Sequence, residues 1–253
     1  MILHPAPVRN RKYYRFDNFP DLRLLCAFST RFLGNTSLSY GDTAHSLENR
    51  KNLLKGLGIH YRDLVCAKQV HGSAARYIRQ VDRGKGALSY DNAIADTDAL
   101  VTDEKNVPLS IFTADCLSIF LYDSKTHAIG LVHAGWRSSK EEIAVKTVKL
   151  MQERFNTRPQ DLCAGFGPAI RECCYEVQGE CAGIFSPEHI IERNGRHYLD
   201  LAGINKKQLL NSGVKDKNIF DSSICTACRN EEFFSFRKEG RDCGRMMSVM
   251  MLK

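Results

Sequence analysis

Two residues that can bind a metal ion, Cys116 and His133, lie in a predicted β-hairpin within residues 111–137. Two short apolar runs of this stretch are rich in β-forming residues, and the only residues between them that are typical of a turn are Asp123 to Thr126. If this turn is centred on residues 124–125, Cys116 lies directly opposite His133. Opposed residues of an antiparallel pair share a face with Cβ atoms about 4.5–5.5 Å apart, so a thiolate and an imidazole there could bind one ion.

A third candidate ligand is His71, which ends a predicted strand over residues 63–72. Two histidines and one cysteine would leave the fourth position of a tetrahedral zinc ion open. An open zinc site lowers the pKa of a bound water towards neutrality and so serves catalysis rather than folding alone. The three residues therefore predict a catalytic metal centre.

Two other interpretations of the same residues remain. Without a metal, Cys116 would be a nucleophile and His133 its base, with Asp115 or Gln69 orienting the base. That interpretation leaves His71 without a role, so we rank it below zinc. In the other, the histidines and the cysteine are ordinary residues of the core or its rim.

An anion site is predicted next to His133. Ser138 and Ser139 each begin a Ser-x-x-Glu pattern, which predicts a helix that starts there and continues to about residue 156. The free N–H groups of this start, with Arg137 alongside, would favour a ligand such as phosphate. Three more arginines lie at the ends of predicted elements and are weaker phosphate candidates: Arg31, Arg237 and Arg245.

Other groups of reactive residues are assigned structural roles. Cys225 and Cys228 have the spacing of a metal or redox motif, and the pair Cys173–Cys174 could supply partners. No second Cys-x-x-Cys accompanies them in the sequence, which favours two buried thiols. The carboxylates of Asp96, Asp98 and Asp115 could orient ligands or transfer protons, although turns and caps use most such residues.

The elements that must position these residues alternate between strands and helices. Helices are predicted over residues 46–57 and 200–211, and a hairpin at Asn194–Gly195. Further strands are predicted at residues 25–32, 94–102, 162–170, 233–236 and 246–252. No linker divides the chain.

Composition excludes several classes of protein. The formal net charge of +7 favours anionic ligands, but the basic residues are spread along the chain without a recognisable nucleic-acid module, so no nucleic-acid partner is expected. The sequence has no apolar run long enough for a membrane span and no signal-peptide pattern at its start, so we expect a cytoplasmic protein. Ten cysteines in a reducing compartment favour metal binding or reactivity over disulfides.

Several motifs together resemble the YfiH family, whose members are called laccase-domain or polyphenol-oxidase-like proteins and purine nucleoside phosphorylases. The resemblance covers nearly the whole chain from about Phe28. The motifs that carry it are Lys68-Gln69-Val70-His71-Gly72, Asp98-Ala99-Leu100-Val101-Thr102, Thr113-Ala114-Asp115-Cys116, Val132-His133-Ala134-Gly135-Trp136-Arg137, Gly167-Pro168-Ala169-Ile170, Cys174-Tyr175-Glu176-Val177, Leu199-Asp200-Leu201, Cys225-Thr226, Phe234-Ser235-Phe236-Arg237 and Gly244-Arg245.

This resemblance implies a fold and a set of activities. The fold is a single α/β (α+β) domain over residues 1–253, a layered sandwich of mixed β-sheets flanked by helices, with a poorly assigned segment over about residues 1–24. The activities are phosphorolysis of adenosine, inosine and methylthioadenosine, and deamination of adenosine, with a purine nucleoside and phosphate as partners. Older names imply a copper-dependent polyphenol oxidase, and a role in peptidoglycan editing would suit a metal-free Cys-His hydrolase or amidase.

The resemblance also implies roles for individual residues. Zinc, or alternatively copper, would be held by His71, Cys116 and His133. Cys116, His133 and Asp115 are the expected catalytic residues, and the expected substrate or phosphate contacts are Arg31, Gln69, Arg137 and Ser138. The chain departs from the family pattern after Arg31, where Phe32-Leu33-Gly34 replaces a glycine pair, and at Ser138, where glycine is common.

Overall fold

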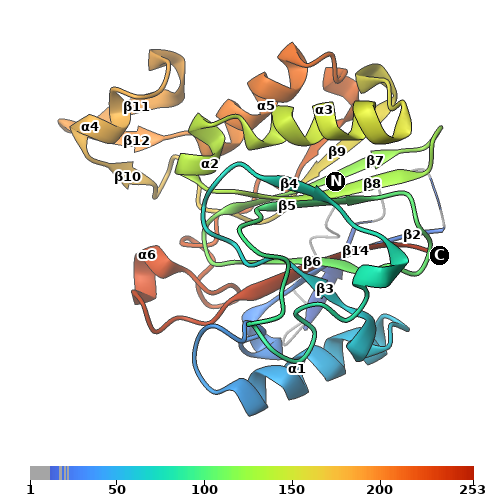
Figure 1. The fold of residues 1–253 in the computed structure, drawn as a ribbon. Helices are drawn as coiled ribbons and strands as arrows, with labels where there is room; N and C mark the ends of the chain where they lie inside the picture. Colours follow the sequence, from blue (N-terminus) through green and yellow to red (C-terminus); the bar gives the residue numbers. More distant parts are fainter. Residues whose placement is uncertain (1–11, 17–18, 20, 22) are drawn as a thin grey trace.

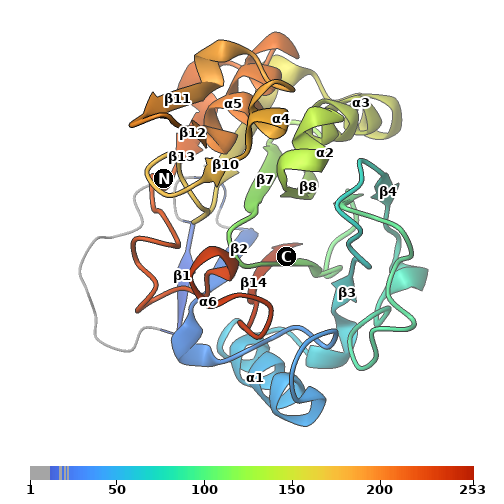
Figure 2. The same cartoon turned by 90° about the vertical axis from the view of Figure 1, so that its left-hand side faces the viewer.

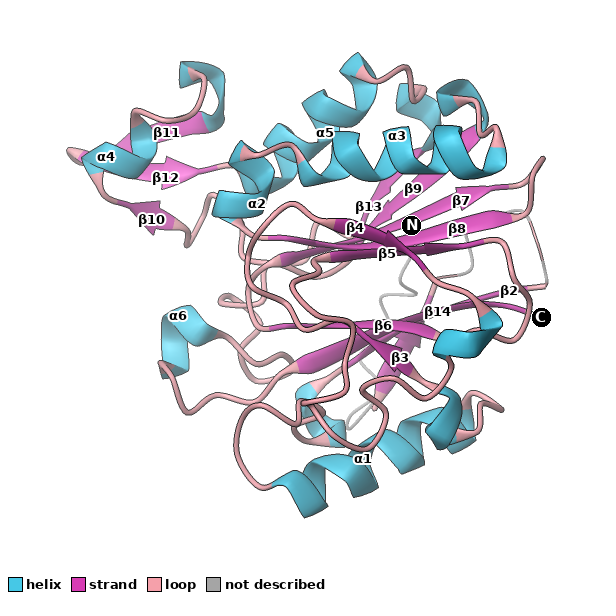
Figure 3. Cartoon of the chain, in the orientation of Figure 1, coloured by secondary structure: helices cyan, strands magenta, loops and turns pink. Residues whose placement is uncertain are grey.

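Strands that are apolar at almost every position indicate sheets buried on both faces. Residues 117–122 and 246–252 have this pattern, and the computed structural model, which describes residues 12–16, 19, 21 and 23–253, places both in stacked sheets. Figure 1 shows the two sheets face to face, with helices over the outer face of each. Figure 3 shows the same four layers, helix, sheet, sheet and helix, as the resemblance implied.

One large sheet contains the predicted hairpin. Among the described residues it has the strand order β13-β9-β7-β8-β5-β4. The pairs β7–β8, β7–β9 and β5–β8 are antiparallel, whereas β4–β5 and β13–β9 are parallel. The strands are β4 (Ala75–Tyr77), β5 (Ala99–Thr102), β7 (Leu117–Asp123), β8 (Ala128–Ala134), β9 (Leu162–Phe166) and β13 (Ile219–Asp221).

The second large sheet brings the two ends of the described chain together. Its order is β1-β2-β14-β6-β3, and β14 is antiparallel to both of its neighbours. Its strands are β1 (Tyr13–Arg15), β2 (Leu24–Ser29), β3 (Val65–Cys66), β6 (Leu109–Thr113) and β14 (Met246–Leu252). A small antiparallel sheet lies to one side and consists of β10 (Glu176–Val177), β11 (Ile190–Arg193) and β12 (Arg196–Leu199).

The helices cover the outer faces of the sandwich. α3 (Ile143–Phe155) and α5 (Leu201–Asn211) pack on the sheet of β7 and β8, and α1 (Thr43–Gly56) packs on the other sheet. The shorter helices are α2 (Trp136–Lys140), α4 (Gly179–Ala182) and α6 (Phe236–Glu239). No helix in the described part of the chain is long and apolar enough to cross a membrane.

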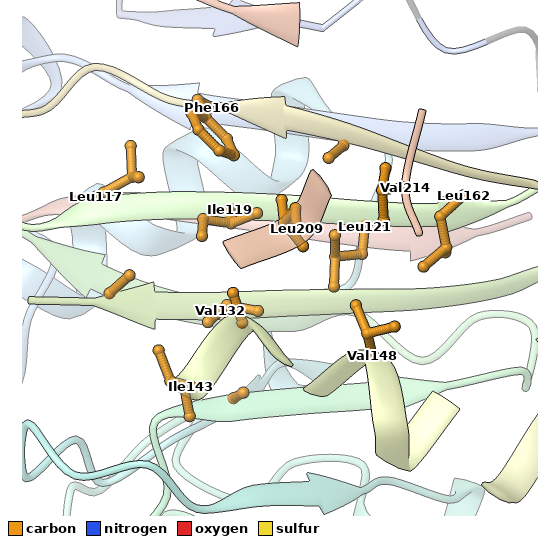
Figure 4. Packing of buried hydrophobic residues seen from close by; sticks show 14 of the residues in the cluster. Leu117, Ile119, Leu121, Val132, Ile143, Val148, Leu162, Phe166, Leu209 and Val214 are labelled. Carbon is orange, nitrogen blue, oxygen red and sulfur yellow. The ribbon is translucent and has the colours of Figure 1, made fainter. Parts of the chain in front are cut away.

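Alternate side chains of each central strand enter different apolar layers. In β7, Leu117, Ile119 and Leu121 pack towards α3 and α5, whereas Phe120 and Tyr122 pack between the sheets. Figure 4 shows the first of these layers, where Ile119 and Leu121 lie near Leu209 of α5. Burying a side chain of this size stabilises the fold by about 1.5–3 kcal/mol, so the hairpin is held firmly on both faces.

The hairpin exists, but its predicted register is wrong by two residues. Ser118, not Cys116, lies opposite His133, and Asp123 pairs with Ala128. The loop is longer than predicted because the Asp123 carboxylate accepts the backbone N–H of Lys125 at 2.8 Å and closes a four-residue turn. A shift of two residues keeps every side chain on its predicted face, so Cys116 and His133 remain close.

Several local predictions are confirmed. Asn194 and Gly195 both have positive φ and join β11 to β12, as expected of a two-residue hairpin turn. The side chain of Asp200 caps α5 by accepting the N–H of Gly203 at 2.8 Å.

Other local predictions are wrong. The strand predicted at residues 233–236 does not form. Residues 233–235 are irregular, and Phe236 begins α6, which Ser235 caps. The single helix predicted from Ser138 or Ser139 is two helices, because Glu142 has a left-handed conformation that separates α2 from α3.

Candidate metal centre

The three predicted metal ligands meet although they come from separate segments. His71 lies in a turn after β3 rather than at the end of a strand, Cys116 directly precedes β7, and His133 belongs to β8. Their ligand atoms all lie within 4.8 Å of one another. The two imidazole rings are 4.8 Å apart between centroids and cross at 77°, so both can face one ion. The cluster is the right size for a single metal ion.

The buried carboxylate of Asp98 orients both histidines. It accepts the backbone N–H groups of Val70, His71 and Gly72 at 3.2, 3.0 and 2.8 Å, and it thereby holds the turn in which His71 has a φ of 60°. It also accepts a hydrogen bond from Nδ1 of His133 at 2.7 Å. Because a carboxylate only accepts, Nδ1 of His133 carries the proton and Nε2 is left for a metal.

The electrostatics of the cluster favour a cysteine thiolate. Burial by itself raises the pKa of Cys116, but His133 and then His71 outweigh burial and lower it to about 6. Burial lowers the pKa of His133, whereas Cys116 and Asp98 together raise it above its ordinary value. A thiolate is the form in which cysteine binds metals and attacks substrates, so this environment suits both kinds of chemistry.

Close packing at the cluster depends on Gly135, the residue that precedes α2. A Cβ atom at this position would lie 3.1 Å from Sγ of Cys116 and 3.2 Å from Cδ2 of His71. The backbone N–H of Gly135 is bound by the hydroxyl of Ser138 at 2.9 Å, which fixes the first turn of α2. The helix start therefore approaches the cluster because no side chain intervenes.

A cavity of about 800 Å³ opens beside the cluster, a size typical of small-molecule sites. Figure 2 faces the edge of the sandwich where it lies, with α2 in the upper layer and α6 below. Four arginines line the cavity, namely Arg50, Arg137, Arg237 and Arg245. Its aromatic side chains are Tyr40, Tyr90, Phe112, Trp136, Tyr175 and Phe236. The lining thus combines positive charge with flat apolar faces. It suits an aromatic ligand that is itself anionic or that binds together with phosphate.

Three of the predicted site residues outside the metal cluster line this cavity. Arg137 is exposed and stacks on Trp136 at 4.4 Å, and its guanidinium has no hydrogen bond or ion pair with any residue that the structure describes. Gln69 lines the cavity, but both ends of its amide bond the backbone of Phe112, at 2.7 and 2.8 Å. Asp115 also lines it.

The carboxylate of Asp115 is engaged by the C-terminal part of the chain. It accepts hydrogen bonds from the hydroxyls of Thr226 and Ser235, at 2.6 and 3.1 Å, and from the backbone N–H of Arg237 at 2.7 Å. Its own backbone has a φ of 91°, an unusual conformation next to Cys116. Through these hydrogen bonds, Asp115 connects the segment between β6 and Cys116 to the part of the cavity wall that contains α6.

Two predicted contacts lie elsewhere. Arg31 does not line the cavity; its side chain forms an ion pair with Glu239 at 3.0 Å and stacks on Phe234. Ser138 is buried, and its hydroxyl is engaged by Gly135. Among the weaker phosphate candidates, Arg237 and Arg245 do reach the cavity.

The sequence analysis missed a buried arginine that lines the cavity. Arg50 belongs to α1 and is only 3% exposed. It donates to the backbone carbonyls of Thr36, Gly86 and Ala87 and stacks on Phe112 at 4.6 Å. The sequence did contain a signal for Arg50. Its spacing places it on the same helix face as Leu53 and Leu54, which is apolar, and an arginine on such a face is unusual.

The fold and the three-donor cluster agree with the comparisons to known proteins. Residues 30–253 match the family described as multi-copper polyphenol oxidoreductase laccase. The chain therefore belongs to this laccase-like family, the YfiH family that its motifs resemble.

Individual relatives have enzyme names. A Geobacillus stearothermophilus protein named purine nucleoside phosphorylase YlmD is 35% identical over 225 residues, which cover 85% of this chain and 82% of the relative. A protein of an unknown prokaryote named adenosine deaminase RL5 is 32% identical over 220 residues, covering 84% of each. The crystal structure of the hypothetical protein YfiH of Bacillus licheniformis has a TM-score of 0.91 at 30% identity, covering 96% of this chain and 97% of that one.

Proposed function

We propose that the protein is a zinc-dependent enzyme that cleaves purine nucleosides with phosphate and also deaminates adenosine. The observation that carries the proposal is the three-donor cluster beside a cavity into which Arg137 brings an unpaired positive charge. The names of two relatives, a purine nucleoside phosphorylase and an adenosine deaminase, support it.

The cluster fits a catalytic zinc ion. His71, Cys116 and His133 are nitrogen and sulfur donors, the ligands that zinc prefers, and three protein donors leave one position for a substrate or a water. Asp98 supports the fit because it already sets the proton of His133 on the far nitrogen. When bound, zinc would supply a Lewis acid at the wall of the cavity.

The residues of the cavity have roles suited to phosphorolysis. In this reaction the bond between the sugar C1′ and the purine nitrogen breaks, a phosphate oxygen bonds to C1′, and the base leaves with a proton. Arg137 would hold the phosphate dianion, for which a planar guanidinium is well shaped. Aromatic rings such as Tyr175 and Phe236 would provide flat faces against the base.

The other predicted site residues are proposed to act in support. Gln69 and Asp115 hold the segments on either side of the cluster by their hydrogen bonds, so we assign them positioning roles rather than direct chemistry. Arg31 and Ser138 are not proposed as substrate contacts, because they face other parts of the chain.

Product analysis tests the proposal. Zinc-loaded protein incubated with adenosine and phosphate should give adenine and ribose 1-phosphate, and inosine from the deamination. Cys116→Ser should lose most of its zinc and both activities. Absence of all three products from zinc-loaded wild-type protein contradicts the proposal, and full zinc retention by Cys116→Ser contradicts the ligand assignment.

Arg137 offers a test of the phosphate site alone. Removing one hydrogen bond to a charged group costs about 1.5–3 kcal/mol, so Arg137→Gln should raise KM for phosphate by about 10- to 100-fold. Deamination uses no phosphate and should change little. Arg76→Gln, an exposed arginine of β4 away from the cavity, is the matched control. Equal loss of both activities would show that Arg137 does not act on phosphate.

A metal-free cysteine enzyme is the second candidate, and the lowered pKa of Cys116 favours it. It predicts that chelation of zinc leaves activity intact while alkylation of Cys116 abolishes it. The family description names a third activity, phenol oxidation with copper. Two assays separate that activity from the proposed turnover of purine nucleosides. One measures oxygen uptake by copper-loaded protein with a phenol, and the other measures nucleoside turnover by zinc-loaded protein.

A further inference from the structure

Four cysteines outside the candidate active site come together on one side of the sheet that contains β7. Cys173 and Cys174 follow β9, and Cys225 and Cys228 follow β13. β13 runs parallel to β9, so the chain leaves both strands at the same edge of the sheet. A parallel bridge between Ala169 and Cys225 continues this pairing beyond the strands and brings the two loops together.

The separations of the sulfur atoms suit one tetrahedral ion. All four Sγ atoms lie within 4.8 Å of one another, and Sγ of Cys228 is 3.5 Å from that of Cys173 and 3.3 Å from that of Cys174. Zinc–sulfur bonds of about 2.3 Å in a tetrahedron place the sulfurs about 3.8 Å apart. A cluster of several iron atoms would hold its cysteines farther apart.

The four cysteines form no disulfide bond, and the local structure differs from that of a catalytic redox pair. Each of the four is a free cysteine, and the separations of 3.3 and 3.5 Å are far longer than a disulfide bond of about 2.05 Å. Cys225 and Cys228 lie in a run of turns rather than at the start of a helix, where catalytic Cys-x-x-Cys pairs gain their reactivity. One disulfide would also leave two of the four thiols unused.

The two loops bury little apolar surface between them. The apolar cluster between them consists of Ile170, Cys225 and Ala227, with Cys174 and Tyr175 partly buried against it. The sequence analysis favoured buried thiols for Cys225 and Cys228. Cys225 is buried, whereas Cys228, like Cys173, is exposed. Exposed sulfurs add nothing to a core, whereas they can complete a metal site.

We propose that Cys173, Cys174, Cys225 and Cys228 bind one zinc ion in a second, structural metal site. Four protein ligands leave no open position, so this ion would hold the fold rather than take part in the reaction. It would fix the wall of the active-site cavity: Tyr175 lines that wall, and Thr226 donates to Asp115, the neighbour of Cys116.

Metal stoichiometry tests this site independently of any activity. Zinc-reconstituted wild-type protein should contain two zinc ions per chain, and Cys228→Ser and Cys173→Ser should each contain one. The substituted side chains are exposed, so the apolar core is unchanged, and circular dichroism checks that each variant is folded before its metal is counted. Cys163→Ser, which changes a partly buried cysteine outside both clusters, should keep two ions. One ion in wild-type protein with no change in Cys228→Ser overturns the proposal.

Cobalt separates the two sites. In the double variant His71→Ala/Cys116→Ala, which lacks two donors of the first cluster, bound cobalt should still give the intense visible absorption of a tetrahedral thiolate site. Adding Cys228→Ser should abolish it. A disulfide at Cys228 in freshly prepared, reduced and zinc-loaded protein, or the red colour of a four-cysteine iron site in purified protein, would overturn the assignment to zinc. If the proposed activity fails while two ions are found, only the activity is refuted.

Discussion

At the scale of single residues, one carboxylate holds both histidines of the candidate metal centre. Asp98 holds the turn of His71 through three backbone N–H groups and holds the imidazole of His133 through Nδ1. Burial raises the pKa of Asp98, but the hydrogen bond and charge of His133 and then the N–H groups of the turn lower it below its ordinary value. The surrounding donors therefore stabilise the ionised form of the Asp98 carboxylate.

Asp98→Asn should weaken zinc binding by about 10- to 100-fold, the usual effect of losing the group that orients a metal-bound histidine. An amide replaces one acceptor oxygen with a donor, which cannot accept from the N–H groups of the turn or from Nδ1 of His133. Competition with a chromophoric chelator measures the affinity.

Asp96→Asn is the matched control for this prediction. Asp96 is exposed, lies two residues away, and already has a positive φ, which asparagine tolerates. Its zinc affinity should equal that of the wild type. Equal affinities for Asp98→Asn and Asp96→Asn would show that Asp98 does not orient the ligands.

At the scale of elements, the cluster depends on how β8 passes into α2. Gly135 connects them with a φ of −87°, which any residue can adopt, so its requirement is space rather than backbone freedom. The missing side chain lets Sγ of Cys116 and the ring of His71 lie against the helix start.

Gly135→Ala should reduce zinc affinity by at least about tenfold, because its Cβ would lie 3.1 Å from Sγ of Cys116 and force the ligand to move. Thermal stability without metal should change much less than zinc affinity. Gly179→Ala at the start of α4 is the control, since a Cβ there meets no atom within 4 Å. Tight zinc binding by both variants would refute the packing requirement.

Local sequence patterns predicted the elements of the site better than their junctions. The hairpin and the cap of α5 are set by a few neighbouring residues, and these predictions agree with the structure. The structure also brings together the three residues predicted to bind a metal. The register failed because the Asp123 side chain closes a longer turn than the sequence pattern suggested. The predicted start of the helix was wrong because Ser138 is the third residue of α2. Its hydroxyl is bound to Gly135, so Ser138 does not cap the helix.

Contacts between distant segments were beyond local patterns. Arg50 reaches the cavity only because α1 packs under the second sheet, where Phe112 covers its guanidinium. The four cysteines meet only because β13 pairs parallel to β9. A sequence shows such residues singly, and the sheet order that joins them is set by packing of the whole chain.

At the scale of the whole molecule, the candidate site lies where the two sheets end together. One wall comes from residues next to β7 and β8, such as Cys116 and Arg137, and another from residues next to β6 and β14, such as Phe112 and Arg245. The positions of these walls therefore depend on how the sheets pack against each other. The layer between them is apolar, with Phe28, Phe120 and Met250 among its buried side chains.

One hydrogen bond between two hydroxyls crosses this apolar layer and joins β7 to β14. Ser118 and Ser248 are both fully buried, and their oxygens are 2.8 Å apart. Ser118 also lies opposite His133, so the pair connects the strand of a proposed metal ligand to the second sheet. Removing one hydroxyl leaves the other buried with its partner lost, whereas removing both leaves two apolar surfaces.

Ser118→Ala and Ser248→Ala should each lower the free energy of unfolding by about 1–3 kcal/mol, and the double variant should lose less than the sum of the two. For a chain of this size, each kcal/mol corresponds to about 2–4 °C in Tm, so zinc-loaded wild type, single variants and double variant can be compared by thermal unfolding. Additive losses would show that the two hydroxyls do not couple the sheets. Because the pair lies behind His133, loosening it in a single variant should also weaken zinc binding, and restoring the packing in the double variant should recover part of that affinity.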